Sequence, residues 1–239
     1  MKILITGASG ALGQSLRKVF PDAYCPPHRE MDITNKNSVN KIMSKYKPEV
    51  VTHAAAVVGI RECEENKEKA WLTNVEGTQN VVDAVKKLNN KCYLIYMSTA
   101  CVFAGEDEKY YTEDDKPSPK NYYSLTKLCG EIVTRQHTNT CIIRTNFVPK
   151  QKWKYQKAFV DRFGTYLFSD NVAEGIGDVI RKKITGIIHI AGSKRMSMHD
   201  LAVLTGSNVG KMTMEEYDGP SLTVDMSLST KRWKKYKIE

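Results

Sequence analysis

The stretches YLIYMSTACVF (residues 93–103) and NYYSLTKLCGE (residues 121–131) decide how the rest of this chain is interpreted. The first stretch begins as an apolar run and ends in two hydroxyl residues, Ser98 and Thr99, which indicates a buried strand with hydroxyl groups at its end. A polar loop separates it from the second stretch, which is predicted to be helical. Strand, loop and helix therefore follow one another here.

A tyrosine and a lysine stand four residues apart in the predicted helix, at Tyr123 and Lys127, and therefore share one helix face. A nearby ammonium group lowers the pKa of a tyrosine from its reference value near ~10, which equips the phenol as a general acid toward a ketone. Tyr122 lacks a lysine at this spacing, so Tyr123 is the candidate acid. Because such pairs are more often solvated, this interpretation depends on what surrounds them.

The chain opens with a short apolar run, residues 1–6, that passes directly into GASGALG, residues 7–13. Glycines let the backbone turn sharply and approach a pyrophosphate, whose charge then faces the free N–H groups of the following helix. A GxxGxxG motif alone is weak, but its place directly after a first strand favours dinucleotide binding. The predicted cofactor contacts in this turn are Gly7, Ser9, Gly10, Ala11, Leu12 and Gly13.

Strands and helices alternate along the chain. Further strands are expected at residues 23–25, 48–56, 141–145 and 186–192, and helices at residues 38–46, 71–88 and 197–204. This alternation predicts an α/β protein with a Rossmann-type doubly wound parallel sheet, covered by helices on both faces. Asp32 or Thr34 is the candidate cap of the helix at 38–46, and Asp170 the cap of a later one.

Two segments outside the regular elements are given roles. The polar loop over residues 105–120 holds two prolines and is long for a compact domain, so we interpret it as a flap before the tyrosine helix. The end of the chain, residues 231–237, is basic with interleaved aromatics. Nucleic acid could stack on such a segment, but a solvated tail is the preferred interpretation.

Composition places the chain among ordinary globular proteins. Its 239 residues suffice for one domain, or for one large domain with a small appendage, and 41% hydrophobic and 26% charged residues are usual shares. The net charge of +9 is compatible with a nucleic-acid or membrane surface, but scattered lysines favour a solvated basic surface. We therefore expect neither nucleic acid nor a membrane as partner.

Cysteine and histidine usage indicates the compartment and the absence of a metal site. Six cysteines without a C-x-x-C pair predict reduced thiols in a cytoplasmic protein. No signal peptide is recognised, and no apolar run approaches the ~18 residues of a membrane helix. His53 has no partner at metal-ligand spacing, so it is interpreted as a packed core histidine.

The chain resembles the extended short-chain dehydrogenase/reductase superfamily, and within it the dTDP-4-dehydrorhamnose reductase-like branch. The motifs that carry the resemblance are STACVF, YYSLTK, RTNF and GIIHIAG, and it covers nearly the whole chain, densely before Asn146 and loosely after it. It implies a dinucleotide-binding Rossmann domain over residues 1–145, and a small substrate lobe interleaved with late Rossmann elements over residues 146–239. Relatives carry a longer helical lobe than the few residues at 150–160, so a reduced C-terminal substrate lobe is expected.

The resemblance also implies roles for individual residues. Thr99 takes a hydroxyl role beside the catalytic Tyr123 and Lys127, with Ser98 as a second hydroxyl, and Asn74 supports the strand ends of the active site. Cofactor contacts beyond the glycine turn are expected from Asp32, Ile33, Ala54, Ala55, Ala56, Ser98, Tyr123 and Lys127. Substrate contacts are expected from Val57, Thr99, Asn146 and Phe147.

The residues after the expected second strand bear on the choice of cofactor. A carboxylate there suits the ribose hydroxyls of NADH, whereas a cation suits the 2′-phosphate of NADPH. Arg29, with His28 before it, supplies a cation, so NADPH is expected. Glu30 leaves NADH possible, and an ordinary surface role for Arg29 is the alternative.

Through the resemblance, these features predict an NADPH-dependent oxidoreductase of rhamnose biosynthesis that reduces C4 of a 4-keto-6-deoxysugar linked to dTDP or UDP. Three alternatives remain open: an NAD-dependent nucleotide-sugar epimerase, a bifunctional 3,5-epimerase/4-reductase with Cys63 and His189 as its extra acid/base candidates, and a non-catalytic dinucleotide-binding subunit. The expected partner is a nucleotide-activated deoxysugar, and a homodimer is possible.

Overall fold

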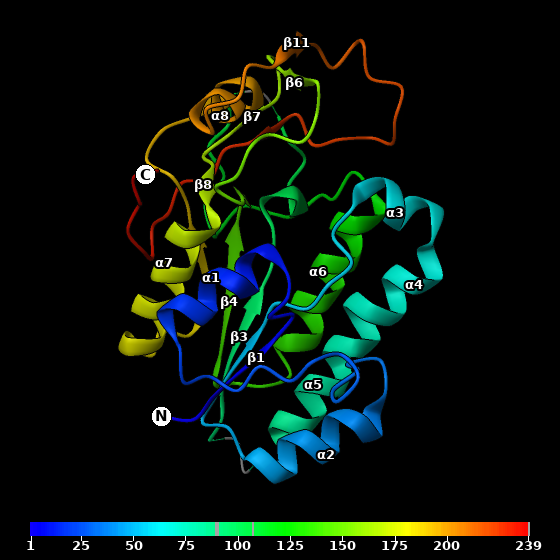
Figure 1. Cartoon of the computed structure of the whole chain (residues 1–239), viewed down its shortest axis with the longest axis vertical. Helices are drawn as coiled ribbons and strands as arrows, with labels where there is room; N and C mark the ends of the chain where they lie inside the picture. The colour runs from blue at the N-terminus through cyan, green and yellow to red at the C-terminus, as the bar shows by residue number, and fades with distance from the viewer. Residues whose placement is uncertain (89–90, 107, 239) are drawn as a thin grey trace.

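A five-stranded parallel sheet forms the centre of the protein (Figure 1). The computed structural model describes residues 1–88, 91–106 and 108–238. Across the sheet the strands follow the order β1 (Ile3–Thr6), β2 (Val50–His53), β3 (Tyr93–Met97), β4 (Thr140–Thr145) and β9 (Gly186–Ile190). Every neighbouring pair is parallel. The predicted Rossmann-type α/β fold is confirmed.

The strand expected at residues 23–25 is reduced to a single bridge, in which Tyr24 pairs with Leu4 on the free side of β1. Pro26 and Pro27 follow at once, and because proline has no N–H group it ends the ladder. The chain thus first returns along one edge of β1, at Tyr24, and then crosses to the opposite edge, where β2 pairs with β1. The carboxyl ends of β1 and β2 form the switch point at which doubly wound sheets bind ligands.

Helices cover both faces of the sheet (Figure 1). On one face lie α1 (Ala11–Val19) and α7 (Ser169–Lys182), and on the other α2 (Lys36–Tyr46), α5 (Gly77–Lys86) and α6 (Tyr122–Thr134). Alternation along β1 explains this arrangement, because Ile3 and Ile5 pack into one core and Leu4 into the other.

The helix expected over residues 71–88 is interrupted. It consists of α4 (Lys67–Trp71), a π-helical turn (Leu72–Glu76) and α5, and the short helix α3 (Ile60–Glu65) precedes it. Turns of this kind frequently occur at functional sites, and this one carries Asn74. A Cβ on Gly77 would come within 3.0 Å of the Ile33 side chain, which explains the glycine by close packing.

The cap of α2 differs from the expectation. Asn35 is the cap, and its Oδ1 accepts two N–H groups of the first turn at 3.0 Å. Asp32 instead accepts the N–H of Thr34 at 2.9 Å in the turn before the helix, so neither residue caps it. Asp170 likewise lies in the first turn of α7, after the N-cap Phe168.

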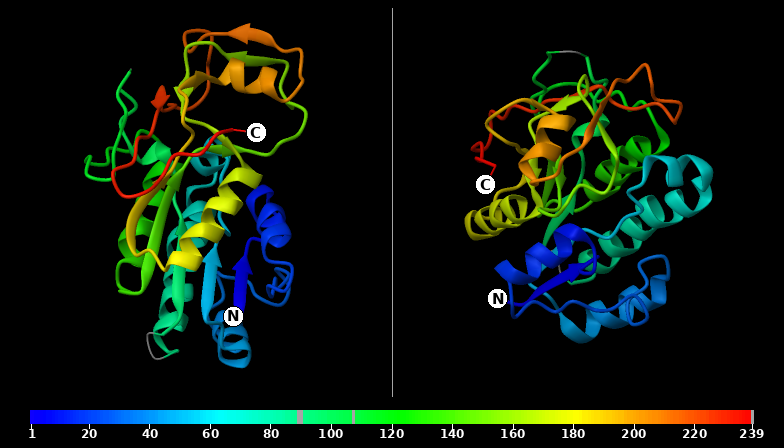
Figure 2. Two further views of the ribbon diagram at one scale, coloured as in Figure 1. Left: turned by 90° about the vertical axis from the view of Figure 1, so that its left-hand side faces the viewer. Right: turned by 45° about the horizontal axis from the view of Figure 1, so that its top comes forward.

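A small lobe lies over the carboxyl ends of the sheet (Figure 2). It contains β5 (Phe147–Val148) paired with β8 (Leu167–Phe168), β6 (Lys157–Phe159) paired with β11 (Gly210–Met212), β7 (Phe163–Gly164) between β10 (Met196–Ser197) and β12 (Asp225–Met226), and the helix α8 (Met198–Leu204). Between these elements the chain returns to the sheet layer for α7 and β9. The division into domains at residue 145 stays a prediction.

The loop over residues 105–120 does not form a flap over the cleft. Tyr111 is buried and bridges to Leu228. The Glu113 carboxylate accepts the N–H of His189 at 3.1 Å and that of Lys231 at 2.9 Å. Position 107 lies outside the described residues. These contacts attach the loop to the last part of the chain instead.

The basic C-terminal stretch packs against the sheet layer, so its interpretation as a solvated tail is wrong. Tyr236 bridges to Gly192, just beyond β9. Its hydroxyl donates to Asp178 Oδ2 at 3.1 Å and accepts from Trp233 Nε1 at 3.0 Å. Both aromatic rings pack against the core beneath α7. Within the described residues, no helix combines the length and apolar character needed to cross a bilayer.

Candidate active site

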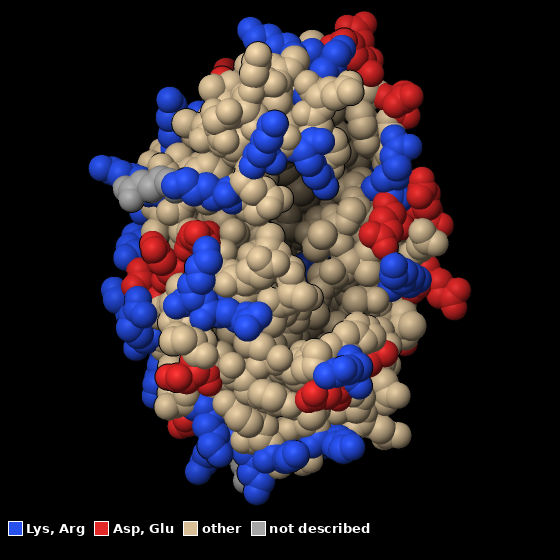
Figure 3. Space-filling view, in the orientation of Figure 1, with Lys and Arg blue, Asp and Glu red and all other residues tan. Residues whose placement is uncertain are grey.

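A cleft of about 760 Å³ lies at the carboxyl ends of the sheet, beneath the lobe, and appears as a hollow in Figure 3. Of the residues predicted to contact cofactor or substrate, those that line it are Gly7, Ser9, Gly10, Ala11, Leu12, Gly13, Asp32, Ile33, Ala54, Ala55, Ala56, Ser98, Thr99, Tyr123, Lys127, Asn146 and Phe147. Arg29 and Val57 do not. The fold thus gathers residues from six separate segments at one place.

The glycine turn after β1 requires two of its three glycines for packing. Gly7 has φ +70°, and a Cβ there would lie 2.6 Å from the Ala55 nitrogen. A Cβ on Gly13 would lie 2.2 Å from the Gly7 oxygen. Gly10, the N-cap of α1, would meet only the Gly7 oxygen, at 3.4 Å, and it lines the cleft. Gly10 therefore keeps open the space before the helix N-terminus, where backbone N–H groups attract an anion.

Two caps fix the start of α6. The Oδ1 atom of Asn121 accepts the N–H of Ser124 at 2.9 Å. Glu64 Oε1 accepts the N–H of Tyr122 at 2.7 Å from the end of α3. Because the first turn is held from both sides, the ring of Tyr123 has a defined position in the cleft.

Burial raises the pKa of Tyr123 above its ordinary value, and a hydrogen bond with the Thr99 side chain partly opposes this effect. Lys127 is not among the groups that shift it, so the expected lowering of this pKa by the ammonium is wrong in this structure. The reason is that desolvation of the phenolate outweighs the hydrogen bond from Thr99 that stabilises the phenolate. At neutral pH the phenol keeps its proton and can donate it.

Lys127 is almost fully buried, and its Nζ lies 4.3 Å from the centroid of the Tyr96 ring. Burial lowers the pKa of Lys127 to about 7, although the Glu131 carboxylate opposes this shift. Burial lowers the pKa of His53, and the charge of Lys127 adds to this shift; the buried ring is held by Thr6 Oγ1 at 2.7 Å. His53 is thus a packed core residue, as expected.

A buried ion pair joins α6 to β4. Glu131 binds Arg144 through two contacts, from Nε at 2.9 Å and from Nη2 at 2.7 Å. Ser98 Oγ donates to the same carboxylate at 2.6 Å, so this hydroxyl is turned toward Glu131 and leaves Thr99 as the hydroxyl beside the phenol. Glu131 was not predicted from the sequence, although it repeats the four-residue spacing of Tyr123 and Lys127.

Asn74 fixes the loop after β2. Its Oδ1 accepts the N–H of Val57 at 2.8 Å, its Nδ2 donates to the carbonyl of Val57 at 2.9 Å, and Nδ2 also contacts Thr126 Oγ1 at 3.0 Å. The expected supporting role of Asn74 is thus visible in the contacts. Val57 itself is held away from the cleft, and Val58 and Ile60 line it instead.

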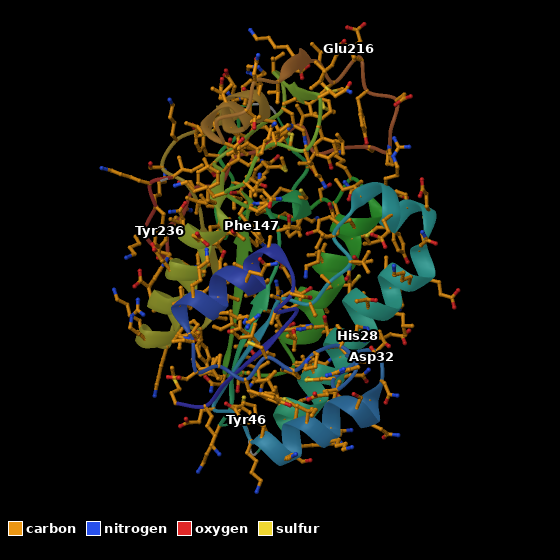
Figure 4. All side chains as sticks on the ribbon, in the orientation of Figure 1. His28, Asp32, Tyr46, Phe147, Glu216 and Tyr236 are labelled. Carbon is orange, nitrogen blue, oxygen red and sulfur yellow. The ribbon has the colours of Figure 1, made fainter. Side chains whose placement is uncertain are left out.

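The end of the cleft that lies away from Phe147 is polar. His28 Nε2 lies 3.8 Å from Asp32 Oδ1, and both residues face the cleft on the side away from Phe147 (Figure 4). Arg29 is exposed and lines neither the cleft nor the adjoining hollow of about 370 Å³. Arg17 of α1 lines that hollow together with His28. Among the described residues, the basic side chains that line this hollow are therefore Arg17 and His28.

Most residues of the upper wall had no predicted role. The additional lining residues are Thr73, Cys101, Thr145, Val148, Pro149, Gln151, Lys152, Trp153, Lys154, Tyr155, Arg162, Tyr166, Met198 and Met226. The lysines and aromatics of residues 150–155 were a visible signal. No signal in the sequence indicated that Met226 lines the cleft, because its position depends on how the last segments of the chain pack.

The extra acid/base candidates of a bifunctional enzyme lie elsewhere. Cys63 is fully buried, and burial raises its pKa to about 11. His189 is also buried, and its Nδ1 lies 2.8 Å from the carbonyl of Ser229. Neither residue lines the cleft. Over residues 1–88, 91–106 and 108–238, no group of three His, Cys, Asp or Glu side chains is arranged to hold a metal ion.

A Rossmann sheet, a glycine turn, a strand-end threonine and a Tyr-x-x-x-Lys helix that meet in one cleft define the class: an oxidoreductase of the extended short-chain dehydrogenase/reductase superfamily. The particular family follows from comparison with known sequences. Residues 1–217 match the RmlD substrate binding domain family, and the chain belongs to it.

Individual relatives agree with this family. The chain is 30% identical over 229 residues to dTDP-4-dehydrorhamnose reductase of Aggregatibacter actinomycetemcomitans, a match that covers 84% of this chain and 77% of the relative. It resembles the crystal structure of a dTDP-4-dehydrorhamnose reductase ortholog from Clostridium acetobutylicum with a TM-score of 0.87 at 30% identity, covering 96% and 90% of the two chains. The corresponding enzyme of Bacillus anthracis, solved in complex with NADP, has a TM-score of 0.88 at 24% identity, covers 96% and 91%, and supports the fold.

Proposed function

We propose that this protein is an NADPH-dependent reductase of a nucleotide-linked 4-keto-6-deoxysugar, with dTDP as the preferred nucleotide and UDP as the alternative. The observation that carries the proposal is the convergence of Thr99, Tyr123 and Lys127 in the cleft that begins at the glycine turn. The 30% identical relative named as a dTDP-4-dehydrorhamnose reductase supports the substrate class.

The cleft fits a dinucleotide cofactor. Gly10 leaves free space before the N-terminus of α1, which suits the pyrophosphate, and Ala54, Ala55 and Ala56 offer small side chains along the next part of the cleft. Arg17 and His28 line the adjoining hollow and suit the 2′-phosphate of NADPH. When bound, the cofactor supplies a hydride.

In the proposed reaction, the residues of this chain supply the proton and hold the carbonyl. The Tyr123 phenol donates its proton to the carbonyl oxygen, and the Thr99 hydroxyl donates a hydrogen bond to the same oxygen. Lys127 holds the nicotinamide ribose, and the hydrogen bond from Thr99 is the contact that favours the tyrosinate. The ketone becomes a secondary alcohol, and the tyrosinate regains a proton from water.

The experiment that tests this function is a panel of nucleotide-linked 4-ketosugars with NADPH and with NADH, followed by the loss of reduced-cofactor absorbance. We expect turnover of a 4-keto-6-deoxysugar with NADPH. The absence of turnover with every sugar, in protein that binds NADPH, would contradict the proposal and favour a non-catalytic subunit. Tightly held NAD in freshly purified protein would instead favour an epimerase.

The Tyr123→Phe variant tests the assigned acid. We expect it to lower kcat by at least about 100-fold, which is the usual contribution of a general acid. The affinity for NADPH, measured by fluorescence titration, should remain within a factor of about 2, because the phenol does not carry the binding energy of the pyrophosphate. Undiminished NADPH oxidation by this variant would show that another group donates the proton.

A further inference from the structure

Arg162, between β6 and β7, holds a buried positive charge in the upper wall of the cleft. It is 7% exposed, and its Nε donates to the carbonyl of Thr223 at 2.9 Å. Among the described residues, the hydrogen-bond partners of the two amino groups are sulfur atoms: Nη1 lies 3.7 Å from Met198 Sδ and Nη2 lies 3.5 Å from Met226 Sδ. Thioethers are weak acceptors, so both amino groups have unused capacity toward the cleft.

Two other arginines, the buried Arg144 and the half-buried Arg195, have carboxylate partners. Arg144 binds Glu131, and Arg195 binds the buried Asp225 at 2.8 Å. Arg162 has no ion pair with a carboxylate of the described residues. Because a buried charge is costly unless it is paired, an unpaired guanidinium that lines a cleft indicates a site for an anion from outside the protein.

Two further donors in the same wall also lack partners. The Tyr166 hydroxyl is buried and lies near the Asn146 amide, but within the described chain it does not meet hydrogen-bond geometry with any group. Trp153 Nε1 is equally buried and unpaired among these residues. Buried polar groups are normally satisfied, and those that are not require an explanation. Arg162, Tyr166 and Trp153 all line the cleft, and a ligand rich in acceptor oxygens is the kind of partner that these donors lack.

The position of Arg162 relative to the reaction centre limits what the anion can be. Met226 Sδ contacts Arg162 on one side, and lies 3.2 Å from Cys101 Sγ, which lines the cleft two residues after Thr99. The anion therefore lies close to a sugar whose carbonyl faces Thr99. In a nucleotide-linked sugar, the charged group nearest the ring is the diphosphate. Figure 3 shows Lys and Arg side chains along the upper rim of the hollow, where the exposed Lys152 and Lys154 belong to its lining.

We propose that Arg162, together with the Tyr166 hydroxyl, binds the diphosphate of the nucleotide-sugar substrate and selects for this charged substituent. The inference rests on the proposed function for the identity of the ligand. The inference also goes beyond the proposed function, because it names the residues that distinguish a nucleotide-linked sugar from an unlinked one. Arg162 supplies two donors in a planar fork that matches phosphate oxygens.

The test is binding of thymidine 5′-diphosphate to NADP⁺-saturated protein by isothermal titration calorimetry, with uncharged thymidine as reference. Saturation with NADP⁺ keeps the probe away from the cofactor's own pyrophosphate site. We expect Arg162→Gln to weaken binding of the diphosphate by about tenfold or more, because charge-assisted hydrogen bonds are the strong ones. The affinity for thymidine should stay the same. Arg181→Gln removes an equal charge from an exposed residue of α7 and is the matched control.

A second variant keeps the test valid if Arg162→Gln does not fold. Tyr166→Phe removes a hydroxyl without a partner among the described residues, so the melting temperature should be unchanged or higher, whereas binding of the diphosphate should weaken several-fold. Wild-type affinity for the diphosphate in folded Arg162→Gln, or in Tyr166→Phe, would overturn the inference.

The outcome is separable from that of the proposed function. Arginine-dependent diphosphate binding without turnover of any ketosugar would contradict the reductase and support the anion site. Turnover with diphosphate binding that is independent of Arg162 would contradict the anion site alone. In an active enzyme, Arg162→Gln should raise KM for the nucleotide-sugar far more than it lowers kcat.

Discussion

At the scale of single residues, the site is built from buried polar groups, some with charged or hydroxyl partners and one, Lys127, that contacts an aromatic ring. Glu131 satisfies Ser98 and Arg144 at once, and its charge is the main influence that opposes the desolvation of Lys127. The ammonium itself contacts the face of Tyr96, where a cation is weakly attracted. The chain therefore holds a lysine that costs stability, which is typical of groups retained for function.

The stability cost of Lys127 gives a pH-dependent prediction. Its folded pKa, about 7, lies below the value of 10.5 for an unshifted lysine, so between these values the unfolded chain binds more protons than the folded one. The free energy of unfolding of the wild type should therefore rise with pH over this window. Below it, Lys127→Met should be more stable than the wild type by on the order of 1–4 kcal/mol, since one pKa unit corresponds to ~1.4 kcal/mol.

Melting temperatures of both proteins, measured from about pH 6 to pH 10, check this prediction. The advantage of Lys127→Met should shrink as the pH rises and the wild-type lysine loses its proton. Lys45→Met, at an exposed position of α2, should show no such trend. A Lys127→Met protein that is less stable than the wild type at low pH would contradict the assigned cost.

At the scale of elements, the glycines of the turn after β1 differ in how closely they are packed. Gly13 faces the backbone of Gly7 and Ala8 closely, whereas Gly10 has open space before α1. The same motif thus contains two glycines that the packing requires, Gly7 and Gly13, and a third, Gly10, that it does not require. Sequence alone gives all three the same weight.

Alanine at Gly13 and at Gly10 should have opposite effects. Gly13→Ala places a Cβ 2.2 Å from the Gly7 oxygen, so it should lower the free energy of unfolding by about 1–3 kcal/mol or more. Gly10→Ala should leave the melting temperature nearly unchanged but weaken NADPH binding by about tenfold, because the methyl group occupies the space of the pyrophosphate. Thermal unfolding and NADPH titration of both variants measure this. Equal losses of stability in the two would show that Gly10 is also structural.

At the scale of the whole molecule, the last part of the chain ties the lobe to the sheet. Met226 reaches the cleft, Leu228 pairs with Tyr111, and Tyr236 pairs beside β9. Segments far apart in sequence thus share the wall of one site. The lobe is held in place by these contacts although its strands are short.

The contribution of the C-terminal contacts can be measured at Tyr236. Tyr236→Ala should lower the free energy of unfolding by about 1–3 kcal/mol, because it removes the ring packed against Gly175 and two hydrogen bonds. Tyr236→Phe should lose only about 0.5–1.5 kcal/mol. Chemical denaturation is the measurement, with the exposed Lys237→Ala as control. A neutral Tyr236→Ala would restore the interpretation of this stretch as a solvated tail.

The sequence by itself determined the alternation of strands and helices, the glycine turn and the Tyr123–Lys127 face, because each of these depends on neighbours within a few residues. Even the missing second strand had a local sign in Pro26 and Pro27. The roles predicted for Thr99, Tyr123 and Lys127 stay predictions, although the cleft brings the three together.

Only the tertiary structure decided which cations face the cleft and which buried charges have partners. Arg29 looked suitable from its place in the chain but is exposed, whereas Arg17 and Arg162 reach the hollows. The raised pKa of Tyr123 and the lowered pKa of Lys127 likewise follow from burial. Burial and pairing are set by other segments of the chain: Glu131 binds Arg144 of β4, and Arg162 contacts Met226 of β12. The local spacing of residues does not encode these contacts.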